Sequence, residues 1–226
     1  MTGLEIAQGS VVQWLATPLS GAAHHALKPW VYWHARSMVL GWSVLLPLGM
    51  LIARFFKIIP GQDWPRVLDC KFWWRTHVWP QSFGVDAMTL GLALAFVAGW
   101  TLVAIGVLQV LGALLRGSKG GPTEETLRGD HYDMTPRRVV FEAVHKHLGW
   151  AAPPIAVGAT GLGLAIVDAP RWMALTLACW WILLGGVFVR LQSSGRCLDT
   201  YQAIWGPDPA LPGNRRKPIG WGVVRR

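Results

Sequence analysis

The chain has 226 residues, of which 52% are hydrophobic and only 15% charged, and its mean hydropathy is +0.34. Soluble domains carry about a quarter charged residues. Because the apolar residues here also gather in long runs, the composition excludes an ordinary soluble domain and predicts an all-α membrane protein. The formal charge of +9 comes from Lys and Arg that flank the apolar runs. This charge indicates membrane topology and anionic lipid headgroups as partners, and we expect no nucleic-acid partner.

Two short observations narrow the chemistry further. Cys70, Cys179 and Cys197 lie far apart, and no C-x-x-C-H motif is present. This spacing argues against covalent haem attachment and against a metal site built from thiolates alone. The N-terminal stretch lacks a basic segment followed by a long apolar one, so we expect no cleaved signal peptide.

The first half of the chain predicts two membrane spans. Residues 1–30 hold scattered apolar positions and predict a partial helix along the membrane interface. The first span is expected from about Val31 to Phe56. The second apolar run, Phe83 to Leu115, contains one charge, Asp86, which we interpret as an interfacial acid near the start of the span. Because the run exceeds the about 20 residues that one crossing needs and falls short of two crossings, it predicts one long, tilted helix.

The second half of the chain predicts two more spans. Thr135 is a candidate cap for a helix that begins at Pro136 and runs on into the third span. The fold class is therefore a four-transmembrane-helix bundle over residues 31–191. The elements that follow are a third span over about 148–167, a tight turn at 168–170, a fourth span over about 172–191, and a polar extramembrane tail over 192–226.

Four spans place both termini on one side of the membrane. More Lys and Arg residues flank the spans on that side than on the other. Because positive loops stay in the cytoplasm, the sequence predicts a multi-pass protein of the inner membrane with both termini cytoplasmic.

Three histidines, His34, His77 and His145, lie at the mouths of the apolar spans. An imidazole at membrane depth is costly unless something uses it, and histidines on facing helices can hold a haem iron from both sides. The first and third spans begin on the same side in the predicted topology, so His34 and His145 are the expected ligands of one haem b. The fourth span offers His77 no histidine partner, so a second haem is not expected.

Each assignment has an alternative. His77 and His147 rank below the chosen pair as iron ligands, and any single histidine at the interface could instead be satisfied by water and headgroups. Arg36 could pair with a haem propionate or face lipid headgroups. Trp42 could pack on the porphyrin face, whereas most of the 15 tryptophans are expected to form an interfacial belt.

Three motifs resemble the core helices of the cytochrome b561 family, most clearly its members that carry a DOMON domain. The segment HARSMVLGWSVLLPLGMLIAR (34–54) resembles the first core helix. The segments WWRTHVWPQ (73–81) and HKHLG (145–149) resemble the openings of the second and third core helices. The last resemblance selects His145 over His147.

The resemblance implies a four-helix core with haem between helices one and three, and a second haem between helices two and four in two-haem members. This chain departs from the family at the fourth helix, where Leu175 and Thr176 follow Trp172 in place of a Tyr-His pair. The glutamine common in the third helix is also missing. Both departures argue for one haem.

The expected function is that of a membrane-bound b-type cytochrome. One bis-histidine haem iron would carry electrons between a quinol or dehydrogenase and another redox partner, within a multisubunit membrane complex. The alternative is a non-catalytic accessory or assembly subunit with structural haem or none. No catalytic side chain is expected, and the sequence leaves open whether the chain is an electron-transfer protein or an oxidoreductase subunit.

Overall fold

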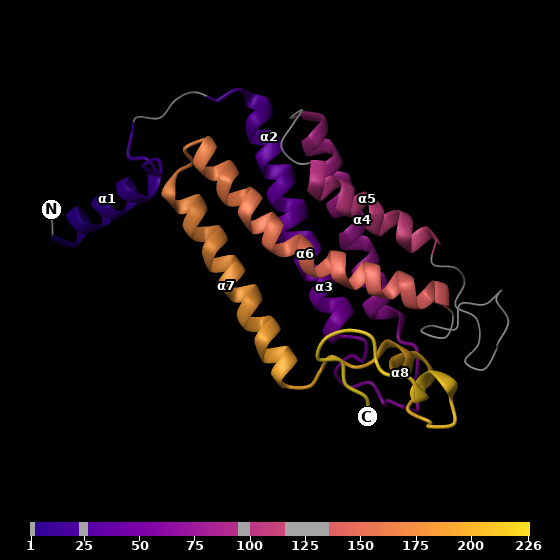
Figure 1. The fold of residues 1–226 in the computed structure, drawn as a ribbon. Helices are drawn as coiled ribbons and strands as arrows, with labels where there is room; N and C mark the ends of the chain where they lie inside the picture. The colour runs from indigo at the N-terminus through magenta and orange to yellow at the C-terminus, as the bar shows by residue number, and fades with distance from the viewer. Residues whose placement is uncertain (1–2, 23–26, 95–99, 116–135) are drawn as a thin grey trace.

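The computed structural model describes residues 3–22, 27–94, 100–115 and 136–226, and these residues form helices with no extended strands. The long helices form a bundle in which they lie side by side as rods (Figure 1). Three segments, residues 29–55, 139–166 and 171–193, are long and apolar enough to cross a membrane. The rods are α2 (Pro29–Met38) continued by η1 (Val39–Leu45) and α3 (Leu46–Phe55), then α4 (Lys71–Leu94), α5 (Trp100–Leu115), α6 (Pro136–Ile166) and α7 (Arg171–Ser193).

The second apolar run is not one long helix. It is divided between α4 and α5, which lie against each other. A Cβ added to Gly106 of α5 would lie 3.3 Å from Cε of Met88 on α4, although a straight helix would separate these positions by roughly 27 Å. The prediction of a single tilted helix is therefore wrong, and the predicted four-helix bundle is not confirmed.

This extra reversal places the two ends of the chain at opposite ends of the bundle (Figure 1). The N-terminal segment contacts the turn between α6 and α7, where the Leu19 amide donates to the Ala169 carbonyl at 3.0 Å. The C-terminal tail contacts the other end, where Arg54 donates to the Trp221 carbonyl at 2.6 Å. The structure therefore does not show the two termini on one side of the bundle, as the prediction of both termini in the cytoplasm requires.

Several other expectations are confirmed. The first, third and fourth predicted spans correspond to the α2–η1–α3 rod, to α6 and to α7. The long helix α6 begins at Pro136 as expected. The N-terminal segment holds one helix, α1 (Gly3–Ala16). The proposed cap Thr135 and the histidines His24, His25 and His131 lie outside the described residues.

Pro47 explains how α7 is attached to the first rod. Proline has no backbone N–H, so it cannot donate to the carbonyl of Ser43, four residues earlier. The indole nitrogen of Trp180 on α7 donates to that carbonyl instead, at 2.5 Å. The turns just before the proline are π-helical, as η1, which is a common local response where the helical hydrogen-bond ladder is interrupted.

Glycines allow the first rod and α4 to approach closely. A Cβ on Gly41 would lie 2.8 Å from the Gly84 carbonyl oxygen, and a Cβ on Gly49 would lie 2.6 Å from Nε2 of Gln81. Small residues at membrane helix interfaces let the two backbones approach closely. The close packing favours association, because the hydrophobic effect does not draw helices together in lipid. The two rods are antiparallel, since positions 41 and 49 meet positions 84 and 81 in reverse order.

The C-terminal tail folds against the bundle. It contains α8 (Thr200–Trp205) and the short 3-10 helix η2 (Pro212–Arg215). Tyr201 and Ile204 of α8 are buried and pack with Trp73 at the start of α4. The tail therefore covers the end of the bundle where α3 ends and α4 begins (Figure 1).

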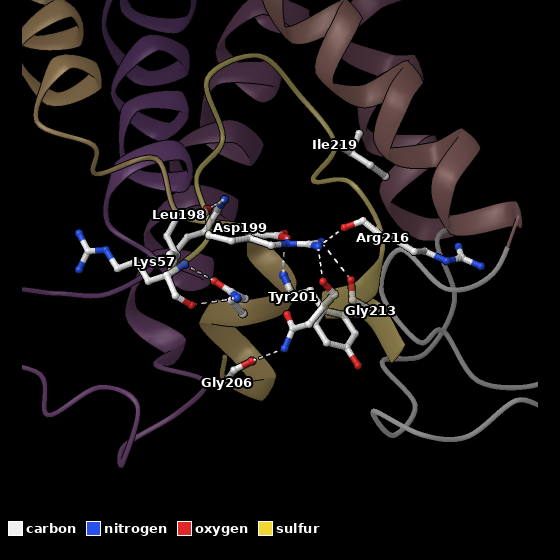
Figure 2. A network of polar contacts seen from close by, with 12 residues as sticks. Lys57, Leu198, Asp199, Tyr201, Gly206, Gly213, Arg216 and Ile219 are labelled. Atoms are coloured by element: carbon white, nitrogen blue, oxygen red, sulfur yellow. Dashed lines mark hydrogen bonds and ion pairs between the residues drawn. The ribbon is translucent and has the colours of Figure 1, made fainter. Parts of the chain in front are cut away.

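A polar network fixes the tail in place (Figure 2). The buried Nζ of Lys57 donates to the Leu198 carbonyl at 2.6 Å, and burial lowers the pKa of this lysine. Arg225 forms an ion pair with the buried Asp199 and also donates to the Gly213 carbonyl at 3.0 Å. These contacts join the connector after α3 to both ends of the tail.

The close contact at Gly41 can be tested by Gly41→Ala. Because the new methyl would meet backbone of α4, we expect a loss of about 1–3 kcal/mol in the free energy of unfolding. The matched control is Gly158→Ala on α6, where a Cβ meets nothing within 4 Å; it should be neutral or more stable by up to about 1 kcal/mol. Denaturant titration in detergent, followed by circular dichroism, measures both, and equal stability of the two variants would contradict the contact.

Candidate haem site

Two histidines from different helices face each other near the tail end of the bundle. His77 lies in the second turn of α4 and His145 in the third turn of α6. Their ring centroids are 6.2 Å apart and their planes are perpendicular. Both side chains are half-buried. The two residues are 68 positions apart in sequence, so the folding of the whole helical domain brings them together.

The backbone of α3 orients the His77 ring. Its Nδ1 lies 3.1 Å from the Gly49 carbonyl oxygen. When Nδ1–H donates to a carbonyl, the neutral ring presents Nε2 as its lone-pair nitrogen, which is the usual arrangement of a metal-ligating histidine. Gly49 permits this contact because its missing side chain lets α4 approach.

Aromatic and amide side chains surround the pair. The Phe141 ring stacks on His145 with centroids 5.4 Å apart, and the Trp74 ring lies 6.4 Å from His77. Nε2 of Gln109 on α5 donates to the backbone carbonyl of His145 at 3.0 Å. These contacts come from α4, α5 and α6, and they hold the two imidazoles in a mainly apolar setting.

The donor set fits a haem iron. Two imidazoles that share one metal, at nitrogen–metal distances of about 2 Å, place their ring centroids roughly 6 Å apart. The separation of His77 and His145 matches that value. No cluster of three or more His, Cys, Asp or Glu side chains occurs among the described residues. The two imidazoles are the groups that would hold a haem iron here.

The structure does not bring His34 to His145. His34 and Gly49 lie on one continuous rod, 15 residues and therefore roughly 20 Å apart, and Gly49 contacts His77 beside His145. The structure therefore places His77, and not His34, next to His145. Arg36 lies beside His34, exposed and over the Trp33 ring at 5.5 Å, so it is equally remote from the pair.

The remaining candidates lie elsewhere. Trp42 is buried in a cluster with Met88, Ala152 and Ala156, deeper in the bundle than the histidine pair. His147 is exposed, and its Nδ1 lies 2.6 Å from the Ala143 carbonyl of its own helix.

Sequence reasoning missed several contacts of the site. Gly49 and Gln81 stood inside the quoted motifs but received no role, and Phe141, on the helix predicted from Pro136, received none either. Gly49 itself gives a usable signal, because a glycine inside a membrane helix permits close helix contact and so exposes a backbone carbonyl to the neighbouring helix. The stacking of Phe141 follows from its spacing of four residues from His145 on one helix.

Comparisons with known proteins agree with the motif resemblance. The chain is 27% identical over 166 residues to the "Cytochrome b561, DM13 and DOMON domain-containing protein" of Arabidopsis thaliana, covering 68% of this chain and 16% of that relative. It is also 27% identical to proteins named "Putative ferric-chelate reductase 1" from Danio rerio, covering 64% of this chain and 25% of the relative, and from Xenopus laevis, covering 73% and 28%.

The chain thus spans between about a sixth and a quarter of the length of these relatives. No protein-family profile and no solved structure matches it. The motifs at 34–54, 73–81 and 145–149 and the sequence relatives point to the same family. The resemblance of this membrane protein to the cytochrome b561 family is therefore confirmed.

Proposed function

We propose that this protein is a membrane-bound b-type cytochrome that transfers electrons through one haem held by His77 and His145. The observation that carries the proposal is the 6.2 Å separation of their ring centroids. The relative named for cytochrome b561 supports the choice of haem b as the bound group. Haem supplies one-electron exchange between ferrous and ferric iron, which protein side chains cannot perform.

The residues of the chain bind and tune that group. His77 and His145 would donate one ring nitrogen each, and the Gly49 carbonyl would fix the tautomer of His77 and raise its basicity. Phe141 and Trp74 exclude water from the imidazoles, which lowers the local dielectric and so influences the reduction potential. The donor is proposed to be a quinol or a dehydrogenase, and the acceptor another redox protein.

The positions of Lys and Arg at the two ends of the bundle support a membrane topology that differs from the one predicted from sequence. Of the described Lys and Arg residues, only Lys28, Arg36 and Arg171 lie toward the N-terminal end of the bundle, and the others lie toward the tail end. The positive-inside rule therefore favours a cytoplasmic tail and a histidine pair near the cytoplasmic face of an inner membrane. A soluble or membrane-bound redox partner would then exchange electrons from that side.

Histidine variants test the ligand pair. His77→Ala and His145→Ala should each abolish the low-spin haem spectrum, because one imidazole cannot complete axial ligation. His34→Ala and His147→Ala are matched controls and should keep it. Optical spectra and pyridine haemochrome content of the purified proteins measure the outcome, and loss of haem in His34→Ala with retention in His77→Ala would contradict the assignment.

Reporter fusions test the topology. Alkaline phosphatase inserted at the turn 168–170 should be active outside the cytoplasm, whereas phosphatase fused after Arg226 should be inactive and green fluorescent protein fused there should fluoresce. This result follows from the excess of Lys and Arg at the tail end. The reverse pattern would show that the histidine pair lies at the outer face.

Electron transfer itself is tested with the purified protein in lipid. A short-chain quinol should reduce the haem at a rate of about 1 per second or faster, as in enzyme turnover. Stopped flow measures this rate from the reduced α band. His77→Ala provides the control for reduction that does not depend on the haem. If haem is bound in one-to-one ratio but stays oxidised with the quinol and with co-purifying dehydrogenases, the protein is an accessory subunit and the proposal fails.

A further inference from the structure

Asp86 lies at the middle of the membrane-spanning part of the molecule. A Cβ on Gly41 would lie 2.8 Å from the Gly84 carbonyl oxygen and 2.9 Å from Cγ of Met88, so Asp86 is level with Gly41. Gly41 is next to the midpoint of the span at residues 29–55. The expectation that Asp86 is an interfacial acid is therefore wrong, because α4 begins 15 residues before it, at Lys71.

The carboxylate of Asp86 has no partner among the described residues. Its side chain is exposed and opens into a groove of about 440 Å³ between η1 and α4. Asp86 is the one acid in this groove, and every other lining residue is apolar. These residues are Leu40, Leu45, Phe83, Ala87 and Leu90.

A carboxylate in this position requires a polar or cationic partner. An Asp at the centre of a membrane helix is costly to insert, and such residues almost always face a partner group or a polar cavity. The groove supplies neither, since its walls are aliphatic or aromatic. A cationic or donor group from outside the chain would satisfy the carboxylate.

The shape of the groove suits a helix. Phe83, Ala87 and Leu90 follow the i, i+4, i+7 spacing of one face of α4, and Leu40 and Leu45 of the antiparallel rod form the opposite wall. A third helix commonly fills the groove between two packed helices. A helix already packs on another flank of α4, where Gly106 of α5 lies against Met88 and Val85.

We propose that the groove between η1 and α4 binds a transmembrane helix of a partner protein that carries a Lys or Arg near its centre, paired with Asp86. Charge complementarity selects this occupant, since an entirely apolar helix would leave the carboxylate buried and unpaired. The inference does not depend on the bound haem.

The test uses a synthetic Leu-Ala helix of about 20 residues, long enough to span a bilayer, with one central Lys. A second helix with Leu at that position is its control. Each carries an acceptor dye, and the full-length protein carries a donor dye in phosphatidylcholine vesicles. Energy transfer should show that the Lys helix binds the wild-type protein about tenfold more tightly than the Leu helix, in line with a polar contact between membrane helices.

Three variants sharpen the outcome. Asp86→Asn preserves the side-chain shape and should remove the preference for Lys, and Ala87→Phe should fill the groove and weaken binding of both helices. Thr89→Val, on the same turn of α4 but outside the groove, should leave the preference intact. Equal binding of the two helices, or a Lys preference that survives Asp86→Asn, would overturn the proposal. Self-association of the chain that Asp86→Asn abolishes would overturn it in favour of a second copy.

Discussion

The close approach of α4 to the first rod at Gly49 is the contact on which the site depends. With no side chain at that position, Gln81 can donate to the Leu46 carbonyl at 3.0 Å, and the His77 ring reaches the Gly49 carbonyl. In a bilayer, polar groups must find partners within the protein, because no water is available to them. One missing Cβ therefore satisfies two polar side chains and sets the direction of His77.

The reversal between α4 and α5 explains most of what the sequence could not predict. The apolar run from Phe83 to Leu115 is too short for two crossings when its start is taken from hydropathy alone. Helix α4 actually starts at Lys71, within a stretch whose charges and histidine resemble a connector. The first turns of α4 lie under the folded tail, where Trp73 packs with Tyr201 and Ile204. Hydropathy alone therefore underestimates the length of this helix. One unrecognised reversal changed the side on which each later element lies.

The types of residue in the site were nevertheless predictable. His145 was identified as a ligand candidate, and the motif WWRTHVWPQ contains His77 and Gln81 in the spacing that the structure uses. The sequence could not predict which histidines lie side by side, because this depends on the direction in which each helix runs. The spans at 29–55, 139–166 and 171–193 were predictable because long apolar runs fix their existence without fixing their neighbours.

Lys146, which follows His145 directly, connects the histidine helix to the tail. Its Nζ donates to the Ile219 carbonyl at 2.6 Å and pairs with the buried Glu142 one turn earlier at 2.5 Å. The tail is in turn tied to α3 and α7, where Arg54 binds Gln192 and the Trp221 carbonyl. These hydrogen bonds join the tail to α6, the helix that carries His145, and to α3 and α7. The backbone beside His145 is therefore linked through Lys146 to Ile219, so the tail helps to set where this part of α6 lies.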